Sequence, residues 1–184
     1  MVPETPKDLT NCRNFVIGDV SLALRAMKDR ATDMHLRPIV VTSKQQGEPG
    51  EAAGLHAREI LGGKYNAYDV LLLGGETTPR LPPNHGTGGR NQHYAAASLL
   101  EMRSYNHPWT IASVGTDGTD FLPDVAGAIV DQSTLIRFSS LGVDVPAFVG
   151  RYDSFGLFRQ MPDCLVVTGN TGTNVGDLVV YVLG

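Results

Sequence analysis

A short apolar run that ends directly in glycine is the strongest constraint on how this chain folds. Residues 70–73 read Val-Leu-Leu-Leu and are followed at once by Gly74 and Gly75. The run predicts a buried strand that stops at the glycine pair. A second glycine-rich stretch over residues 86–92 leads into an alanine-rich pattern over residues 94–102, which predicts a helix. A strand, a polar loop and a helix therefore follow one another here.

The residues at this predicted helix start are suited to an anion. Gly88 and Gly89 let backbone N–H groups come close to a ligand, and a helix start adds a positive dipole end. Arg90 adds a planar fork that matches phosphate or carboxylate, and Asn91 is equally suited to contact a substrate or to cap the helix. We predict a site for an anionic, phosphorylated ligand, with an ordinary surface ion pair of Arg90 as the alternative.

The composition is that of a globular protein. The chain has 184 residues, of which 42% are hydrophobic, and no apolar run approaches the roughly 20 residues that span a bilayer. The formal charge is −4 and there is no Lys/Arg run, so we expect neither a nucleic-acid nor a membrane partner. We expect residues 1–13 to form a polar lead-in and residues 14–184 to form one domain.

The two cysteines favour a reducing compartment. Cys164 lies in an apolar run, Cys12 lies in the polar lead-in, and their spacing does not suit a metal. We therefore expect a cytoplasmic protein, and a mitochondrial one stays open if a further segment precedes the chain.

Strand and helix patterns alternate along the chain. Strands are predicted at residues 14–17, 38–42, 68–73, 109–114, 164–167 and 178–183. Helices are predicted at residues 20–32, 50–61, 89–103 and 133–141, with a helical start over 123–130 and short helices within 145–161. This alternation predicts an α/β fold whose sheet is mostly parallel, with helices on both faces and an antiparallel C-terminal strand pair.

Three polar loops follow predicted strands. They cover residues 74–91, 115–124 and 169–174. Because ligands of parallel sheets bind beyond the carboxyl ends of the strands, we expect the three loops to share one rim and to form the site together.

Four acids lie just past predicted strand ends: Glu76, Asp117, Asp120 and Asp124. Mg²⁺ is usually held by one or two carboxylates together with substrate phosphates and water. Each acid also has an ordinary interpretation, because Asp120 and Asp124 would suit a helix N-terminus and Asp117 would suit a turn. Taken together, we expect a metal or phosphate role for at least one of them.

The third loop offers the side chains of Thr171, Thr173 and Asn174 but no lysine, so it is not a Walker A loop. An anion-binding nest and a plain hairpin connection are equally compatible with it. The five histidines lack zinc-site spacing, and the first predicted strand–helix turn lacks the G-x-G-x-x-G pattern of a Rossmann dinucleotide site.

Five ordered motifs resemble the C-terminal domain of class II glycerate 2-kinases, also called the MOFRL domain. They are Gly74-Gly75-Glu76-Thr77-Thr78, Gly88-Gly89-Arg90-Asn91-Gln92, Gly115-Thr116-Asp117-Gly118 with Asp120, Asp124-Val125-Ala126-Gly127-Ala128, and Thr171-Gly172-Thr173-Asn174-Val175. The resemblance extends from about residue 14 to residue 183.

The resemblance implies transfer of a phosphoryl group from ATP, with Mg²⁺, to D-glycerate, giving 2-phosphoglycerate. It implies an active site in a cleft shared with an N-terminal glycerate kinase domain that supplies a lysine and has no counterpart here. The isolated chain would then be inactive or nearly so, and an oligomer is possible. A non-catalytic small-anion-binding domain is the first alternative, and hydroxypyruvate reductase, which requires a nicotinamide site, is the second.

Family roles carry over to matching positions as expectations. Arg90 would hold a phosphate or the glycerate carboxylate, and Glu76 and Asp117 would bind Mg²⁺. Asp120 or Asp124 would position the attacking hydroxyl. The phosphate or glycerate would also meet Thr171, Thr173 and Asn174.

The chain departs from the family's usual residues at three places. His93 stands where an acid is usual, Phe121-Leu122-Pro123 replaces a Gly-Pro-Thr tendency, and Asn170 replaces a proline. These departures bear on substrate identity rather than on the fold.

Overall fold

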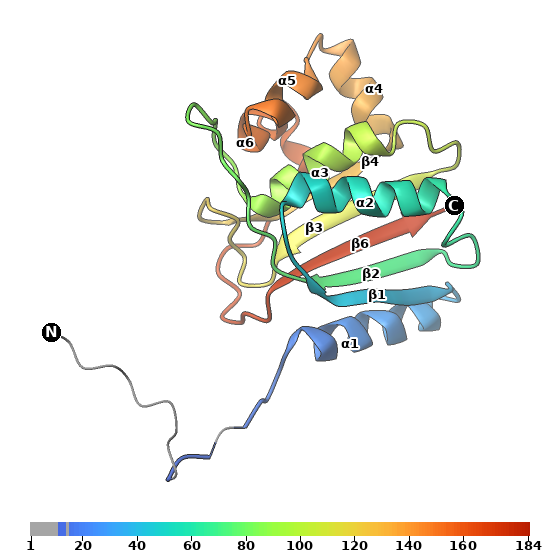
Figure 1. The fold of residues 1–184 in the computed structure, drawn as a ribbon, viewed down its shortest axis with the longest axis vertical. Coiled ribbons are helices and arrows are strands. Elements are labelled where there is room, and N and C mark those ends of the chain that lie inside the picture. Colours follow the sequence, from blue (N-terminus) through green and yellow to red (C-terminus); the bar gives the residue numbers. More distant parts are fainter. Residues whose placement is uncertain (1–10, 14) are drawn as a thin grey trace, which may run out of the picture.

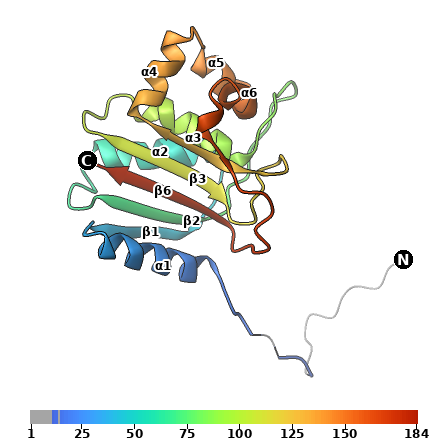
Figure 2. The same cartoon turned by 180° about the vertical axis from the view of Figure 1, so that it is seen from behind.

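A computed structural model describes residues 11–13 and 15–184 of the chain. A six-stranded sheet lies between one helix on one face and two helices on the other (Figures 1 and 2). Within the described residues, none of the helices has the length and apolar character needed to cross a bilayer. The strand predicted at 14–17 is not formed: residue 14 lies outside the described residues, and Phe15, Val16 and Ile17 are exposed and extended before the first helix.

The sheet is mixed and mostly antiparallel. Its strands are β1 (Pro38–Gln45), β2 (Val70–Gly75), β3 (Trp109–Gly115), β4 (Val125–Asp131), β5 (Leu165–Val167) and β6 (Asp177–Leu183). Their order in space is β1-β2-β6-β3-β4-β5, and only β1 and β2 pair in parallel. The prediction of a mostly parallel sheet is therefore wrong, although the helices do lie on both faces.

One cause of this error is the segment after β3, where a helical start over residues 123–130 was predicted and strand β4 is found. Phe121 and Asp124 both have left-handed backbone angles, with φ of 68° and 69°, so the chain reverses there in a tight turn. Strand β4 then runs back beside β3. The proline at 123 lies within this turn and starts no helix.

The second cause is the position of the C-terminal strand. We predicted that β5 and β6 pair with each other, but β6 lies between β2 and β3 and is antiparallel to both. The nine residues 168–176 that connect them span β4 and β3. Three strand spacings amount to about 14 Å, which nine residues cross easily. A short connection was thus not proof of a hairpin.

The helix predictions are largely confirmed, with ends that differ by at most two residues. Helix α1 (Val20–Asp33) packs on β1 and β2, while α2 (Pro49–Leu61) and α3 (Arg90–Glu101) cover the opposite face (Figure 1). The three shorter helices α4 (Gln132–Ser140), α5 (Val145–Gly150) and α6 (Ser154–Phe158) pack around α3.

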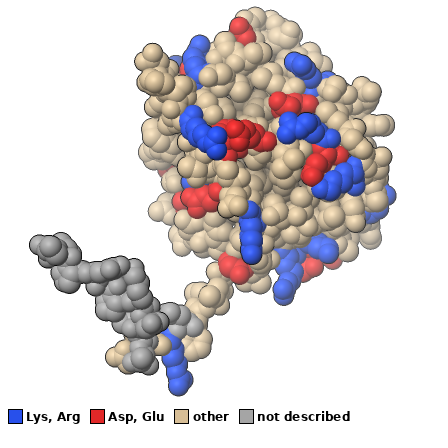
Figure 3. Space-filling view, viewed as in Figure 1, with Lys and Arg blue, Asp and Glu red and all other residues tan. Residues whose placement is uncertain are grey.

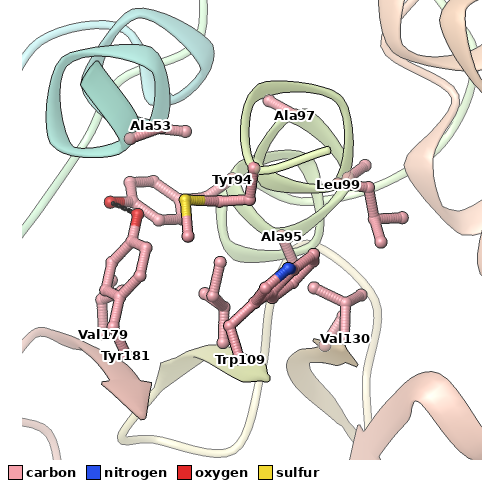
Figure 4. Packing of buried hydrophobic residues seen from close by; sticks show 14 of the residues in the cluster. Ala53, Tyr94, Ala95, Ala97, Leu99, Trp109, Val130, Val179 and Tyr181 are labelled. Carbon is pink, nitrogen blue, oxygen red and sulfur yellow. Dashed lines mark hydrogen bonds between the residues drawn. The ribbon is translucent and has the colours of Figure 1, made fainter. Parts of the chain in front are cut away.

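Helix α3 lies at the centre of the larger core. Nine of its twelve residues are buried, and the small side chain of Ala95 lies beside Trp109 of β3, so that the helix can come close to the sheet (Figure 4). Tyr94 on α3 and Tyr181 on β6 are fully buried, and their hydroxyl oxygens are 2.7 Å apart in a hydrogen bond. This bond joins the buried helix to the central strand, and the burial of both rings keeps their pKa values above the usual tyrosine range.

Strand directions bring three loops to one edge of the sheet, here called the loop edge. Strands β2 and β3 end there, and β4 and β6 begin there. The loop edge therefore gathers residues 76–89, 116–124 and 168–176, which lie on the same side of the sheet in both views (Figures 1 and 2).

The tyrosine pair predicts a stability effect. Tyr181→Phe leaves the hydroxyl of Tyr94 without this buried partner, so we expect the free energy of unfolding to fall by about 1–3 kcal/mol. Urea denaturation followed by circular dichroism measures it. Tyr105→Phe, at a half-buried tyrosine, is the control, and equal effects of the two substitutions would contradict the importance of the pair.

Candidate functional site

Arg90 is the first residue of α3 and lies at the loop edge between two acids. Its Nε and Nη2 donate hydrogen bonds to Asp177 Oδ2 and Oδ1 at 2.6 and 3.0 Å. Its Nη1 forms an ion pair with Glu76 Oε1 at 2.8 Å. The guanidinium that we expected to face a ligand is thus held in place by the chain itself.

The charge of Arg90 is secure. Partial burial lowers its pKa, but the hydrogen bonds and attraction of Asp177, together with the charge of Glu76, raise it further, and the net pKa lies above the usual arginine value. Arg90 therefore presents a permanent cation at the loop edge.

Asp120 caps helix α3. Its Oδ1 accepts the backbone N–H of Asn91 at 2.9 Å, and its Oδ2 accepts that of Gln92 at 2.8 Å. The carboxyl is buried, which raises its pKa, while these donors act in the opposite direction. Two of the amides that a helix start would offer to an anion, those of Asn91 and Gln92, are therefore already engaged by Asp120.

Asn91 also points into the protein. Its Nδ2 donates to Asp120 Oδ1 at 3.3 Å, and its Oδ1 accepts the hydroxyl of Ser113 on β3 at 2.7 Å. The side chain is buried, so its contacts in this structure join α3 to the sheet.

The glycine pair before α3 is needed for packing. A Cβ on Gly88 would overlap the side chain of Ser154, and a Cβ on Gly89 would overlap Asp120. Gly88 also has φ of 150°, a conformation that other residues rarely adopt. The close approach permitted by these glycines is to the protein's own loops and to α6.

The second and third loops are bound to each other. Thr171 Oγ1 donates to the carbonyl of Thr116 at 2.5 Å, and Thr116 Oγ1 donates to the carbonyl of Gly176 at 2.7 Å. Gly118 packs so closely against Gly169 that a Cβ would overlap its carbonyl oxygen. The two loops therefore form one rigid wall of the loop edge.

The remaining predicted site residues lie on this wall and are mostly exposed. Asp117 is half-buried and its Oδ1 accepts the N–H of Thr119 at 3.0 Å, as a turn residue does. Asp124 and Thr173 are exposed, and exposed Asn174 uses its Oδ1 to accept the N–H of Gly176 at 2.9 Å. Among residues 11–13 and 15–184, no group of three or more His, Cys, Asp or Glu side chains is arranged to hold a metal.

Sequence reasoning missed Asp177. This residue starts β6, its side chain is only 8% exposed, and it holds Arg90 by two hydrogen bonds. The expectation of a parallel sheet directed attention to the ends of strands, whereas Asp177 is the first residue of a strand that runs the other way. The Gly176-Asp177 step at a strand start was the available signal.

A second missed cluster lies beside α3. The ring of His93 stacks on that of Tyr152 with centroids 4.0 Å apart, and the Tyr152 hydroxyl donates to Glu48 Oε1 at 2.8 Å. Glu48 Oε2 in turn caps α2 by accepting the N–H of Glu51 at 2.8 Å. Burial lowers the pKa of His93, and the nearby charge of Glu48 only partly opposes this. His93, at the position where the family that this chain resembles usually has an acid, thus packs against Tyr152.

Comparison with known proteins agrees with this architecture. Residues 69–177 match the MOFRL family. D-glycerate 2-kinase of Thermotoga maritima is 32% identical over 185 residues, which cover 98% of this chain and 44% of the relative. A putative hydroxypyruvate reductase of Agrobacterium vitis is 35% identical over 193 residues, covering 98% of this chain and 43% of the relative.

A solved structure shares the fold. The crystal structure of glycerate kinase from Thermotoga maritima matches with a TM-score of 0.87 and 31% identity, over 98% of this chain and 44% of that one. The chain belongs to the MOFRL family and is homologous to the C-terminal part of glycerate 2-kinases. It spans less than half the length of these relatives.

The capping role of Asp120 predicts a stability effect. In Asp120→Asn one carboxylate oxygen becomes an NH₂ group that faces a backbone N–H, so we expect the free energy of unfolding to fall by about 1–3 kcal/mol. Urea denaturation measures it. Asp124→Asn changes an exposed acid in the same loop and should stay within about 0.5 kcal/mol. An unchanged or increased stability of Asp120→Asn would refute the capping role.

The buried His93 predicts a pH dependence. Because its folded-state pKa is below that of the unfolded chain, about 6.5, the unfolded state binds more protons as the pH falls through 6.5, and stability is lost. His93→Gln should reduce the loss of unfolding free energy between pH 7.5 and 5.5. Part of that loss should remain in this variant, because burial also lowers the pKa of His56. The control is exposed His85→Gln, and an undiminished loss in His93→Gln would be the contrary result.

Proposed function

We propose that this chain is the C-terminal domain of a kinase that transfers a phosphoryl group from ATP to D-glycerate, giving 2-phosphoglycerate. Membership of the MOFRL family and homology to glycerate 2-kinases support the proposal. The observation that carries it is a permanent cation, Arg90, held in one orientation at the edge where three loops meet.

Phosphoryl transfer depends mainly on positioning and on stabilisation of negative charge. Arg90 would bind a phosphate or the glycerate carboxylate through its fork. The wall formed by the second and third loops would orient the ligand through Thr171, Thr173 and Asn174. Because Asp120 is engaged by α3, positioning of the attacking hydroxyl falls to exposed Asp124.

Mg²⁺ would be held jointly by a carboxylate of this chain and by the phosphates of the nucleotide. The ion typically takes one or two carboxylates together with nucleotide phosphates and water. At the loop edge Glu76 is paired with Arg90, whereas half-buried Asp117 and exposed Asp124 have no ion-pair partner within the described residues, and Asp117 would be the ligand from this chain. Glu76 would become available only after it leaves Arg90. When bound, Mg²⁺ would neutralise charge on the phosphates of ATP.

The rest of the site would come from an N-terminal domain. The chain spans less than half of its kinase relatives, and the loop edge holds one well-placed cation. We propose that the active site lies in a cleft between the two domains, so that this chain alone has little or no turnover.

The name of the Agrobacterium vitis relative favours a second candidate, reduction of hydroxypyruvate. That reaction needs a nicotinamide site, and this sequence lacks the usual dinucleotide motif. The test joins this chain to the N-terminal part of a kinase relative. Oxidation of NADH on adding hydroxypyruvate to that two-domain protein would favour this candidate over the kinase.

The proposed role of Arg90 predicts a large loss of activity. We would join this chain to the N-terminal part of Thermotoga maritima D-glycerate 2-kinase, in place of that enzyme's own C-terminal part. In this two-domain protein Arg90→Ala should lower the rate of 2-phosphoglycerate formation by about 10³ or more, because transition-state charge loses its partner. Arg80→Ala, at an exposed arginine, is the control.

Two outcomes would contradict the proposal. One is near-normal turnover of the Arg90→Ala protein. The other is a folded two-domain protein without kinase activity under conditions in which the parent enzyme is active. For the isolated chain, calorimetric titration with ATP, Mg²⁺ and D-glycerate separates anion binding without turnover from no binding.

A further inference from the structure

The guanidinium of Arg90 is held in different ways on its two sides. One edge, Nε with Nη2, forms a two-bond contact with Asp177. The remaining group, Nη1, meets only the single oxygen Oε1 of Glu76 among the hydrogen-bond and ion-pair partners within the described residues. Asp177 therefore positions the guanidinium of Arg90, and Glu76 occupies the group that Asp177 leaves free.

The two acids differ in burial. The side chain of Asp177 is 8% exposed, whereas that of Glu76 is 63% exposed. Breaking a buried ion pair leaves an uncompensated charge and is costly, while an exposed pair contributes little because water replaces the partner. Asp177 is thus the lasting partner of Arg90, and Glu76 is the exchangeable one.

The backbone of Glu76 is held by hydrogen bonds, while its side chain is largely exposed. Its N–H donates to the carbonyl of Gln45 at 2.7 Å, and Thr78, two residues on, donates to the carbonyl of Gly47 at 2.7 Å. The carboxylate can therefore leave Arg90 by side-chain rotation alone, without movement of the loop or of β2.

We infer that Glu76 is an internal competitor for the ligand of Arg90: its carboxylate occupies the guanidinium until a carboxylate or phosphate anion displaces it, while Asp177 keeps the guanidinium in position. Asp177 is then a positioning residue, since it acts on the ligand through Arg90. This inference rests on the proposed function for the nature of the ligand, but not for the geometry of the arginine.

The two acids are predicted to have opposite effects on anion binding, although each substitution removes one negative charge from the same arginine. Glu76→Gln frees Nη1 and should tighten binding by about two- to fivefold, the range expected for an exposed ion pair. Asp177→Asn leaves the guanidinium unoriented and should weaken binding at least as much.

The test is calorimetric titration of the 184-residue chain, without Mg²⁺, using inorganic phosphate in one series and D-glycerate in the other to distinguish a phosphate site from a carboxylate site. Arg90→Ala should abolish the binding that is measured. Glu51→Gln is the matched control: it removes the same charge from an exposed acid that lies 3.6 Å from Arg80, and it should leave the affinity unchanged.

A spectroscopic measurement separates positioning from a purely structural role. The Nε–H signal of Arg90, assigned in ¹H–¹⁵N NMR spectra by its loss in Arg90→Lys, reports the contact with Asp177. We expect Glu76→Gln to leave this signal in place and to enlarge its response to anion, and Asp177→Asn to move or broaden it in a chain whose circular dichroism shows that it is folded.

The inference and the proposed function fail in different ways. Arg90-dependent anion binding that Glu76→Gln does not tighten would overturn the competitor role and leave the kinase proposal standing. If Glu76→Gln and Glu51→Gln tightened anion binding equally, the effect would be one of net charge, and the competitor role of Glu76 would be overturned as well. Absence of binding to Glu76→Gln would overturn the inference for this chain, while kinase activity of the two-domain protein is measured independently.

Discussion

The ion pair between Asp177 and Arg90 joins the central strand of the sheet to the start of the buried helix. In the sheet register Asp177 lies opposite Gly75 on β2 and opposite Gly115 on β3, so it marks the point where three neighbouring strands reach the loop edge. Its two hydrogen bonds set the direction of the guanidinium. Because the carboxylate that orients Arg90 belongs to a residue of β6, the position of β6 in the sheet sets the orientation of the guanidinium.

The loop edge is arranged around that pair by polar contacts that are internal to the chain. Asp120 holds the first amides of α3, and Thr116 binds the third loop to the second. The glycines at 88 and 89 make these approaches possible, since any side chain there would overlap a neighbour. Such a preorganised edge costs little to arrange when a ligand binds, which is what positioning catalysis requires.

Part of this could be predicted from the sequence and part could not. Helix periods placed α1 to α4 within two residues, and the apolar runs located β1 to β3, because local pattern determines these elements. Strand order is a non-local property: β6 enters between β2 and β3, and no feature of residues 168–177 distinguishes this path from a hairpin. The shared edge of the three loops was expected from a parallel sheet, and the mixed sheet also brings them together because β4 and β6 begin where β2 and β3 end. The site residues were chosen by chemical type, which could not reveal that Asp120 and Asn91 face inward or that Asp177 holds Arg90.

We propose that this domain meets its ligand at the loop edge. The opposite edge has a hollow of about 460 Å³, lined in part by Tyr65, Tyr105 and Gly184, and it is one alternative place for a ligand. The most direct measurement is a ¹H–¹⁵N NMR titration of the backbone amides with D-glycerate. We predict shift changes concentrated in residues 76–92, 116–124 and 168–177. Changes concentrated around Tyr65, Tyr105 and Gly184, or none at the loop edge, would contradict the account.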